Sequence, residues 1–180
     1  MSLCLPDQLQ TARLVIRAPR LADAAHLFAA YTQDPQVARH MVWRPHQAVA
    51  ETENFIAHCM RGWASGQSRP YVLASHGSEH LPLGMLEARI VSHSIDIGYV
   101  LARRHWGQGL MPEALSALVD AALSLPGCFR VQATCNVDNP ASARTLEKSG
   151  FVREGRLERY AVFPNISSEP GSCFMYARCR

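Results

Sequence analysis

The chain has 180 residues, of which 48% are hydrophobic and 18% charged, and these values fit one folded domain with a sizeable core. A net charge of +3 without any run of Lys or Arg argues against nucleic acid as a partner. No apolar run approaches the length that crosses a membrane, and the first ten residues lack the pattern of a secretory signal. We therefore expect a cytoplasmic protein with no membrane contact and a single domain over residues 1–180.

The first half of the chain alternates strand and helix signals. Residues 13–17 predict a strand that ends before Pro19. Asp23 is a candidate cap for a helix that stops near Asp34 and Pro35, and a second helix is expected over residues 48–63, closed by Gly66. Two neighbouring strands then follow, at residues 70–76 and 83–91.

The second half opens with a strand over residues 95–101, in which apolar residues recur at every second position. A glycine-containing turn leads to an amphipathic helix over residues 113–125, and residues 131–135 predict a buried strand. Asn139 caps a further helix that runs to Gly150. The remaining strands are expected at three places, residues 151–154, 160–163 and 173–178.

This order of elements predicts an α+β fold. The strand–helix–strand unit around residues 113–125 implies one parallel strand pair inside a sheet that is otherwise largely antiparallel.

Cysteine and histidine positions point to no metal or disulfide. The cysteines have no Cys-x-x-Cys spacing, and reduced thiols are expected at 4, 59, 128, 135, 173 and 179. His76 and His80 lie four residues apart, but Gly77 and Ser78 between them predict a loop rather than a helix that carries ligands. No metal site is expected.

The stretch from the central strand to the next helix has the chemistry of an anion site. Trp106-Gly107-Gln108-Gly109 forms the turn, and Pro112 suits the first helical turn, where a missing N–H costs nothing. Unpaired amides at a helix start attract phosphates. The sequence matches neither a Walker A loop nor a dinucleotide fingerprint, because Leu110-Met111-Pro112 follows Gly109.

Two blocks of residues resemble one family. The run Asp96-Ile97-Gly98-Tyr99-Val100-Leu101, with His105-Trp106-Gly107-Gln108-Gly109 and Glu113-Ala114, resembles the acetyl-CoA motif of the GNAT superfamily of N-acetyltransferases. The block Asn136 to Ser142, with Leu146-Glu147-Lys148-Ser149-Gly150-Phe151, resembles a second segment of that family. The Trp-Gly-x-Gly pattern is similar to its ribosomal-protein N-terminal (RimJ/RimL-type) subgroup. The GNAT fold is then expected: six to seven strands with one splayed parallel pair, flanked by about four helices.

The resemblance implies how acetyl-CoA is bound. Main-chain groups of Tyr99, Val100 and Leu101 would bind the pantetheine arm in the splay, and Asn139 and Ser142 would line it from the other side. Amides of the turn would hold the pyrophosphate; with the subgroup's Trp106 these residues are Gly107, Gln108, Gly109, Leu110 and Met111. Met111 replaces a small residue of the family pattern, so its side chain must point away from the phosphates.

The implied reaction is attack of an amine on the acetyl thioester, which requires a proton acceptor. Asp96 and Glu87 lie on strands that lead toward the splay and are the candidate bases, with Asp96 slightly favoured. Pairing of these carboxylates with Arg89 is the structural alternative. Leu146 stands where many members of the superfamily have a Tyr that protonates the thiolate, which leaves Ser142 as the candidate acid.

The acceptor amine is the least determined part. The first two helices, residues 40–45 and residues 164–171 are expected to shape its pocket, with Trp43 either as a wall of it or as a plug between helices. The subgroup favours a protein N-terminal α-amine. A small-molecule amine such as a polyamine, amino acid or aminoglycoside stays open, as do a CoA-binding module without turnover and a homodimer.

Overall fold

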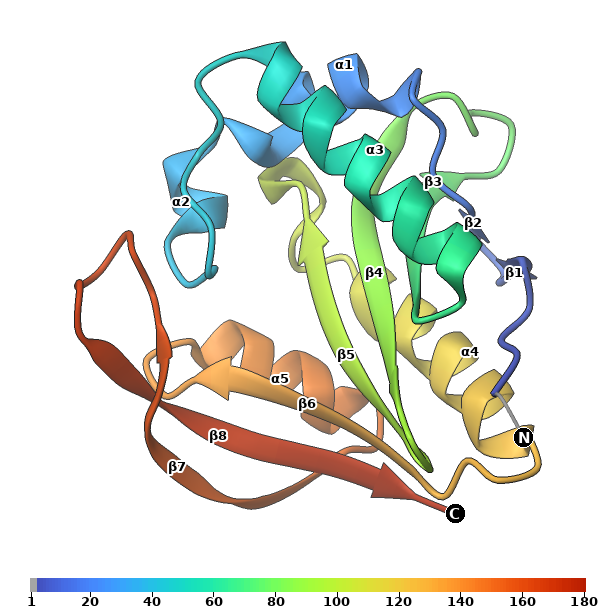
Figure 1. The fold of residues 1–180 in the computed structure, drawn as a ribbon, viewed down its shortest axis with the longest axis vertical. Helices are drawn as coiled ribbons and strands as arrows, with labels where there is room; N and C mark the ends of the chain where they lie inside the picture. Colours follow the sequence, from blue (N-terminus) through green and yellow to red (C-terminus); the bar gives the residue numbers. More distant parts are fainter. Residues whose placement is uncertain (1–2) are drawn as a thin grey trace.

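A single sheet of eight strands organises the computed structural model, which describes residues 3–180 (Figure 1). The strands lie in the order β1-β2-β3-β4-β5-β6-β8-β7, and β5 and β6 form the parallel pair while the other neighbours are antiparallel. Their bounds are β1 Gln8–Gln10, β2 Leu14–Arg17, β3 Ser68–Ser75, β4 Pro82–Val91, β5 Ser94–Leu101, β6 Arg130–Asn136, β7 Val152–Val162 and β8 Pro170–Cys179.

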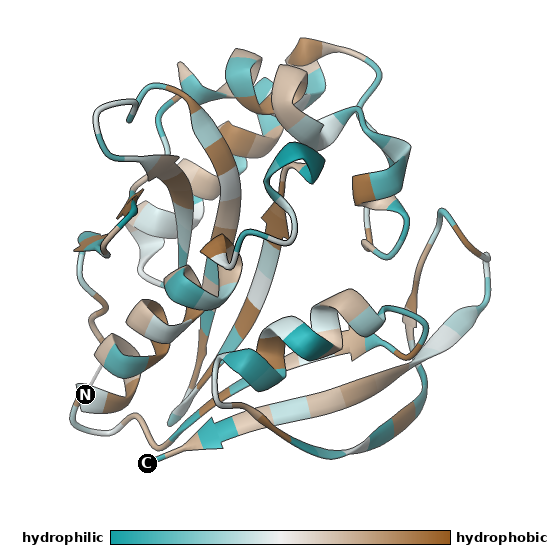
Figure 2. Cartoon of the chain, turned by 180° about the vertical axis from the view of Figure 1, so that it is seen from behind, coloured by the Kyte–Doolittle hydropathy of each residue, from teal (hydrophilic) through white to brown (hydrophobic). Residues whose placement is uncertain are grey.

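Helices cover both faces of this sheet. α1, η1, α2 and α3 lie on the face toward the viewer in Figure 1, and α4 and α5 lie on the opposite face, which Figure 2 turns forward. Their bounds are α1 Asp23–Leu27, the π-helix η1 Phe28–Thr32, α2 Pro35–Ala38, α3 Val49–Ser65, the 3₁₀-helix η2 Arg103–His105, α4 Leu110–Ser124 and α5 Pro140–Lys148.

The alternation along β5 divides the core into two clusters. Ile95, Ile97 and Leu101 pack with α4 and α5, whereas Val100 and Ala102 pack with α1 and α3. Side chains of odd and even residues of β5 therefore point to opposite faces of the sheet. Each face of the sheet at β5 is thus built from a different set of side chains of this one strand.

The expected α+β architecture is confirmed, with one correction to the strand count. The sheet has eight strands instead of six to seven because β1, a three-residue polar strand, pairs with β2 at the edge. The two short strands expected over residues 151–163 form one bulged strand, β7, whose register shifts at Arg153/Gly155 and Leu157/Ala161. A short polar edge strand has no apolar alternation by which sequence could reveal it.

The helices of the first half also differ from expectation. Five α-helices stand where about four were expected, since the helix that starts at Asp23 widens into η1 and a separate one-turn α2 follows. Asp23 is not a cap. Its carboxylate is buried and accepts hydrogen bonds from the Arg17 guanidinium at 2.6 and 2.9 Å.

The parallel pair opens toward its carboxyl end. β5 and β6 are paired only from Ser94–Arg130 to Asp96–Gln132, although β5 continues to Leu101 and β6 to Asn136. β5 meanwhile stays paired with β4 as far as Leu101, and β6 with β8 as far as Asn136. Each strand therefore keeps its outer neighbour while the two strands separate from each other, which is the splay expected from the resemblance (Figure 1).

Candidate active site

The diverging edge of β5 presents main-chain groups that no strand takes up. Ala102 N–H donates to Leu83 O at 2.8 Å, so even-numbered residues of β5 direct their main chain to β4. By alternation, the N–H and C=O of Tyr99 and Leu101 face the splay. The main-chain groups of Val100 face β4 in this geometry. They therefore do not face the splay, where they were expected to bind the pantetheine arm.

The turn from β5 to α4 is an open cradle of amides. Gly107 and Gly109 both have left-handed backbone, with φ of 74° and 73°, and a Cβ on Gly107 would meet nothing within 4 Å. Within residues 3–180, none of the amides of residues 107–111 donates a hydrogen bond to a protein group. Leu110 already begins α4, so these amides converge at the start of a 15-residue helix.

Met111 does not obstruct this cradle. Its side chain is only 5% exposed and packs in the cluster beneath α4. The requirement that it point away from a bound phosphate is therefore met by core packing. Leu146, which replaces the family's Tyr, is fully buried in the same cluster.

Arg13, which immediately precedes β2, binds the turn between β5 and α4. Its Nη1 donates to Gln108 O at 2.9 Å, and its Nε donates to Glu113 Oε2 at 2.6 Å. Burial alone would raise the pKa of Glu113, but hydrogen bonds from Thr11 and Arg13 outweigh it and lower that pKa. The sequence gives no local sign of this role, since Arg13 and Glu113 are 100 positions apart.

Trp106 secures the other end of the turn. Its Nε1 donates to Leu101 O at 2.8 Å, and the indole is 47% exposed. This bond fixes where β5 ends and takes up the main-chain carbonyl of Leu101.

Tyr99 and Ser142 meet across the splay. The Tyr99 hydroxyl lies 2.6 Å from Ser142 Oγ and 3.1 Å from Ser142 O. Burial raises the pKa of Tyr99 far above its ordinary value, with the Ser142 hydrogen bond opposing this in part, so the phenol stays protonated. Asn139 Oδ1 accepts from Ser142 N–H at 3.1 Å and caps α5 as expected. The sequence predicted a main-chain role for Tyr99 and missed this side-chain contact.

Glu87 and Asp96 lie on the opposite face, and both bind Arg89. Arg89 Nη1 contacts Glu87 Oε2 at 2.6 Å, and Arg89 Nη2 contacts Asp96 Oδ2 at 2.5 Å. Burial opposes the charge on Arg89, but Asp96 and then Glu87 outweigh it and raise the pKa of Arg89. Asp96 belongs to the last parallel pair, whereas Glu87 is paired with Gly98, two residues further along β5 and inside the divergent part.

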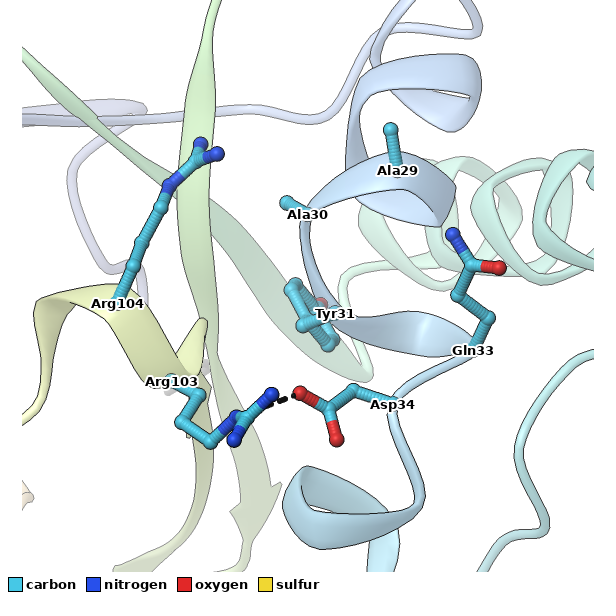
Figure 3. A pocket seen from close by; sticks show the side chains of 7 residues that line it. All are labelled: Ala29, Ala30, Tyr31, Gln33, Asp34, Arg103 and Arg104. Atoms are coloured by element: carbon cyan, nitrogen blue, oxygen red, sulfur yellow. Dashed lines mark hydrogen bonds and ion pairs between the residues drawn. The ribbon is translucent and has the colours of Figure 1, made fainter.

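A surface hollow of about 320 Å³ adjoins the start of the turn (Figure 3). Arg103 Nε binds Asp34 Oδ2 at 3.0 Å across it, and Figure 3 shows Arg104 pointing away from this pair. The ion pair joins η2 to the N-cap residue of α2. It therefore links the turn to the segment that was expected to shape the acceptor pocket.

These features fit a CoA-type ligand. The amide cradle suits a diphosphate, and the unpaired edge of β5 suits an extended arm with amide groups. Within residues 3–180 no group of three His, Cys, Asp or Glu side chains could hold a metal ion, and the cysteines are free thiols. No helix of the described residues has both the length and the apolar content needed to cross a membrane.

Comparison with known proteins gives the class. The model of the acetyltransferase (GNAT) domain family matches residues 13–152, which is most of the chain. The protein belongs to this family of acetyltransferases.

Two curated relatives are similar in sequence. An uncharacterized N-acetyltransferase p20 of Bacillus licheniformis is 27% identical over 157 residues, which cover 86% of this chain and 87% of the relative. A ribosomal-protein-serine acetyltransferase of Escherichia coli is 35% identical over 88 residues, which cover 49% of this chain and 48% of the relative.

Solved structures share the fold over nearly the whole chain. The microcin C7 self-immunity acetyltransferase MccE, in complex with acetyl-CoA and AMP, has a TM-score of 0.86 at 20% identity and covers 99% of both chains. RimL, a ribosomal L7/L12 α-N-protein acetyltransferase in complex with coenzyme A, has a TM-score of 0.82 at 21% identity and covers 97% of both. The expected cofactor, acetyl-CoA, is thus of the kind bound by two similar structures.

Proposed function

We propose that this acetyltransferase transfers the acetyl group of acetyl-CoA to the α-amine of a protein N-terminus. The observation that carries the proposal is the divergence of β5 from β6 beside the unbonded amides of residues 107–111. This arrangement supplies a phosphate cradle and an open strand edge on one continuous segment of chain. When bound there, acetyl-CoA supplies the thioester whose acetyl group is transferred.

The amides of Gly107, Gln108, Gly109, Leu110 and Met111 would hold the pyrophosphate, with the dipole of α4 adding to their effect. Tyr99 and Leu101 would hold the pantetheine arm through main-chain groups on the β5 edge, and the Leu101 N–H is the donor nearest the turn. Asn139 and Ser142 line the α5 side of the same opening.

Glu87 and Asp96 would take the proton of the acceptor amine. An α-amine has an ordinary pKa of about 8, so a fraction is already neutral at pH 7 and a weak base suffices. We assign the main role in proton removal to Glu87, because it lies level with the divergent part of β5. Asp96 Oδ2, in contrast, accepts two hydrogen bonds from Arg89. Arg89 holds both carboxylates in place.

Ser142 would protonate the departing thiolate from the opposite face. Its hydroxyl lies 2.6 Å from the neutral Tyr99 phenol, which can replace the proton that Ser142 gives up. The base and the acid thus approach the opening from the two faces of one sheet. This separation allows the amine and the cofactor to enter from opposite sides.

The choice of acceptor is supported by the ribosomal-protein-serine acetyltransferase among the relatives. The experiment is steady-state release of CoA with peptides that begin with Ser, Ala or Met, against spermidine and an aminoglycoside. We expect turnover with at least one peptide and none with spermidine. Turnover only with small amines would replace the proposed acceptor, and CoA binding without turnover on every acceptor would make the chain a binding module.

We further propose that the enzyme works in the cytoplasm, with residues 1–180 as one catalytic domain. The mass in solution, measured by light scattering, would determine whether two copies form a homodimer.

A further inference from the structure

A short segment that begins at the last residue of α2 links the two halves of the sheet on the proposed acceptor side. We call residues 38–43 the bridging segment. Asn165, in the loop between β7 and β8, donates from its side-chain amide to Ala38 O and to Trp43 O, both at 2.7 Å. Ala38 is fully buried, and Trp43 packs against the same cluster as Val100 of β5.

The bridging segment therefore ties β5 to the β7–β8 loop. β5 and β6 are joined at one end by their parallel pairing, and their halves of the sheet are joined again through the hydrogen bonds of Asn165 to this segment. Trp43 contributes as a packing residue, with its ring centroid 5.8 Å from that of His46. It fills a junction between elements, which is one of the two roles expected from sequence.

His40 lies in the middle of the bridging segment and has no hydrogen-bond partner among the described residues. Its Nδ1 is buried without a hydrogen-bond partner, which leaves Nε2 as the nitrogen that can bind a ligand. The charged groups that act on the ring are Arg39 of its own segment and Asp138 of the turn between β6 and α5. The segment that carries His40 is bonded to Asn165 of the loop between β7 and β8, which lies by the carboxyl end of β6, so His40 lies on the side where the splay opens.

The burial of Nδ1 determines how this ring can act. A proton on Nδ1 would be a buried N–H without an acceptor, which is costly, so the neutral ring carries its proton on Nε2. Burial lowers the pKa of His40, and Arg39 adds to this against the opposing effect of Asp138. At neutral pH the side chain is consequently an uncharged N–H donor.

We propose that His40 is a positioning residue whose Nε2–H binds the carbonyl oxygen next to the acceptor amine. This proposal rests on the proposed function and narrows its substrate class. A neutral N–H donor can bind the first carbonyl of a peptide, but it has nothing to offer an alkyl ammonium, which carries donors only. The residue thus favours peptide N-termini over polyamines.

The experiment compares His40→Leu, which removes the donor, with His40→Gln, which keeps an N–H of similar reach. The acceptors are the peptide Ser-Ala-Ala and butylamine, which lacks a carbonyl. A bond that forms equally in the ground and transition states changes KM alone. We expect His40→Leu to raise KM for the peptide by about fivefold to tenfold, the range for one hydrogen bond, with kcat within about twofold.

The other readouts separate positioning from a structural or a basic role. His40→Gln should stay within about threefold of wild type, and kcat/KM for butylamine, CoA affinity and Tm should not change. His58→Leu, on the exposed face of α3, is the matched histidine control. An equal loss with butylamine would make His40 structural, and a changed pH profile of kcat in His40→Gln would make it a base. Either result overturns the proposal.

The wild-type enzyme tests the proposed function separately. If it acetylates Ser-Ala-Ala and His40→Leu behaves identically, only the role of His40 fails. If it acetylates butylamine and not the peptide, or neither amine, the peptide acceptor fails and the role of His40 fails with it.

Discussion

The cofactor side and the acceptor side of this molecule are built in different ways. The proposed cofactor side would use main-chain groups from one continuous stretch, which comprises β5, the turn after it and the start of α4, together with the cap of α5. The proposed acceptor side depends on contacts between residues far apart in sequence, such as the hydrogen bond from the Asn165 side-chain amide to the main-chain oxygen of Ala38, 127 positions away. Main-chain chemistry follows from local conformation, whereas side-chain pockets depend on the complete fold.

The difference is also electrostatic. Arg13, Arg103 and Arg104 lie around the turn between β5 and α4, and Arg13 and Arg103 form ion pairs with Glu113 and Asp34. On the other face, Arg89 is shared between two carboxylates, which leaves that cluster with a net negative charge. Anion binding on one side and amine binding on the other are consistent with this distribution.

The largest expected effect is on the carboxylate cluster. Glu87→Gln should lower kcat by about 100-fold at pH 7, the low end for a general base, and Asp96→Asn should lower it less. Initial rates with saturating acetyl-CoA measure this. Glu154→Gln is the matched control, because Glu154 is 43% exposed and bound to Arg130, as Glu87 is 41% exposed and bound to Arg89. A larger loss in Asp96→Asn would reverse the assignment.

The next test separates the cradle from ordinary glycine strain. Gly107→Val places a branched side chain at φ 74° and should weaken CoA binding at least about tenfold. Gly77→Val is matched, since Gly77 has φ 73° and nothing within 4 Å of a Cβ. Both variants should lose about 1–2 kcal/mol of stability, and only the first should lose CoA in calorimetry. Equal CoA affinity in the two variants would contradict the cradle.

A smaller effect on kcat is expected at the contact between Tyr99 and Ser142. Tyr99→Phe removes the phenol that contacts Ser142, and kcat should fall by about fivefold with little change in CoA affinity. Tyr176→Phe, which loses a hydroxyl bonded to Glu147 at 3.0 Å, controls for the loss of one buried contact. Equal rates in the two variants would show that Ser142 needs no help from Tyr99.

How far sequence could predict this structure follows the same division. The alternation in residues 95–101 predicted the central strand, the glycines at 107 and 109 predicted the turn before α4, and Asn139 before Pro140 predicted the cap of α5, whereas the splay was implied only by the family resemblance. Arg13 could not be predicted, because its role depends on Glu113 far along the chain. Asp23 was misassigned since a carboxylate before a helix usually caps it, whereas here Arg17 binds it.

The smallest effect concerns pH. Glu113 has a pKa below its ordinary value in the folded protein, so its contribution to stability is full above the unfolded pKa and is lost as pH falls through the folded value. Tm measured between about pH 5 and pH 3 should therefore fall less steeply in Glu113→Gln than in wild type. Identical slopes would show that the Arg13–Glu113 clamp does not contribute to stability.

Hydrogen exchange of the backbone amides, with and without CoA, tests the central claim most directly. The account predicts that CoA slows exchange at residues 107–111 and at Tyr99 and Leu101, while the edge strand β7 is unchanged. Protection elsewhere in the molecule, with residues 107–111 exchanging as fast as before, would contradict it.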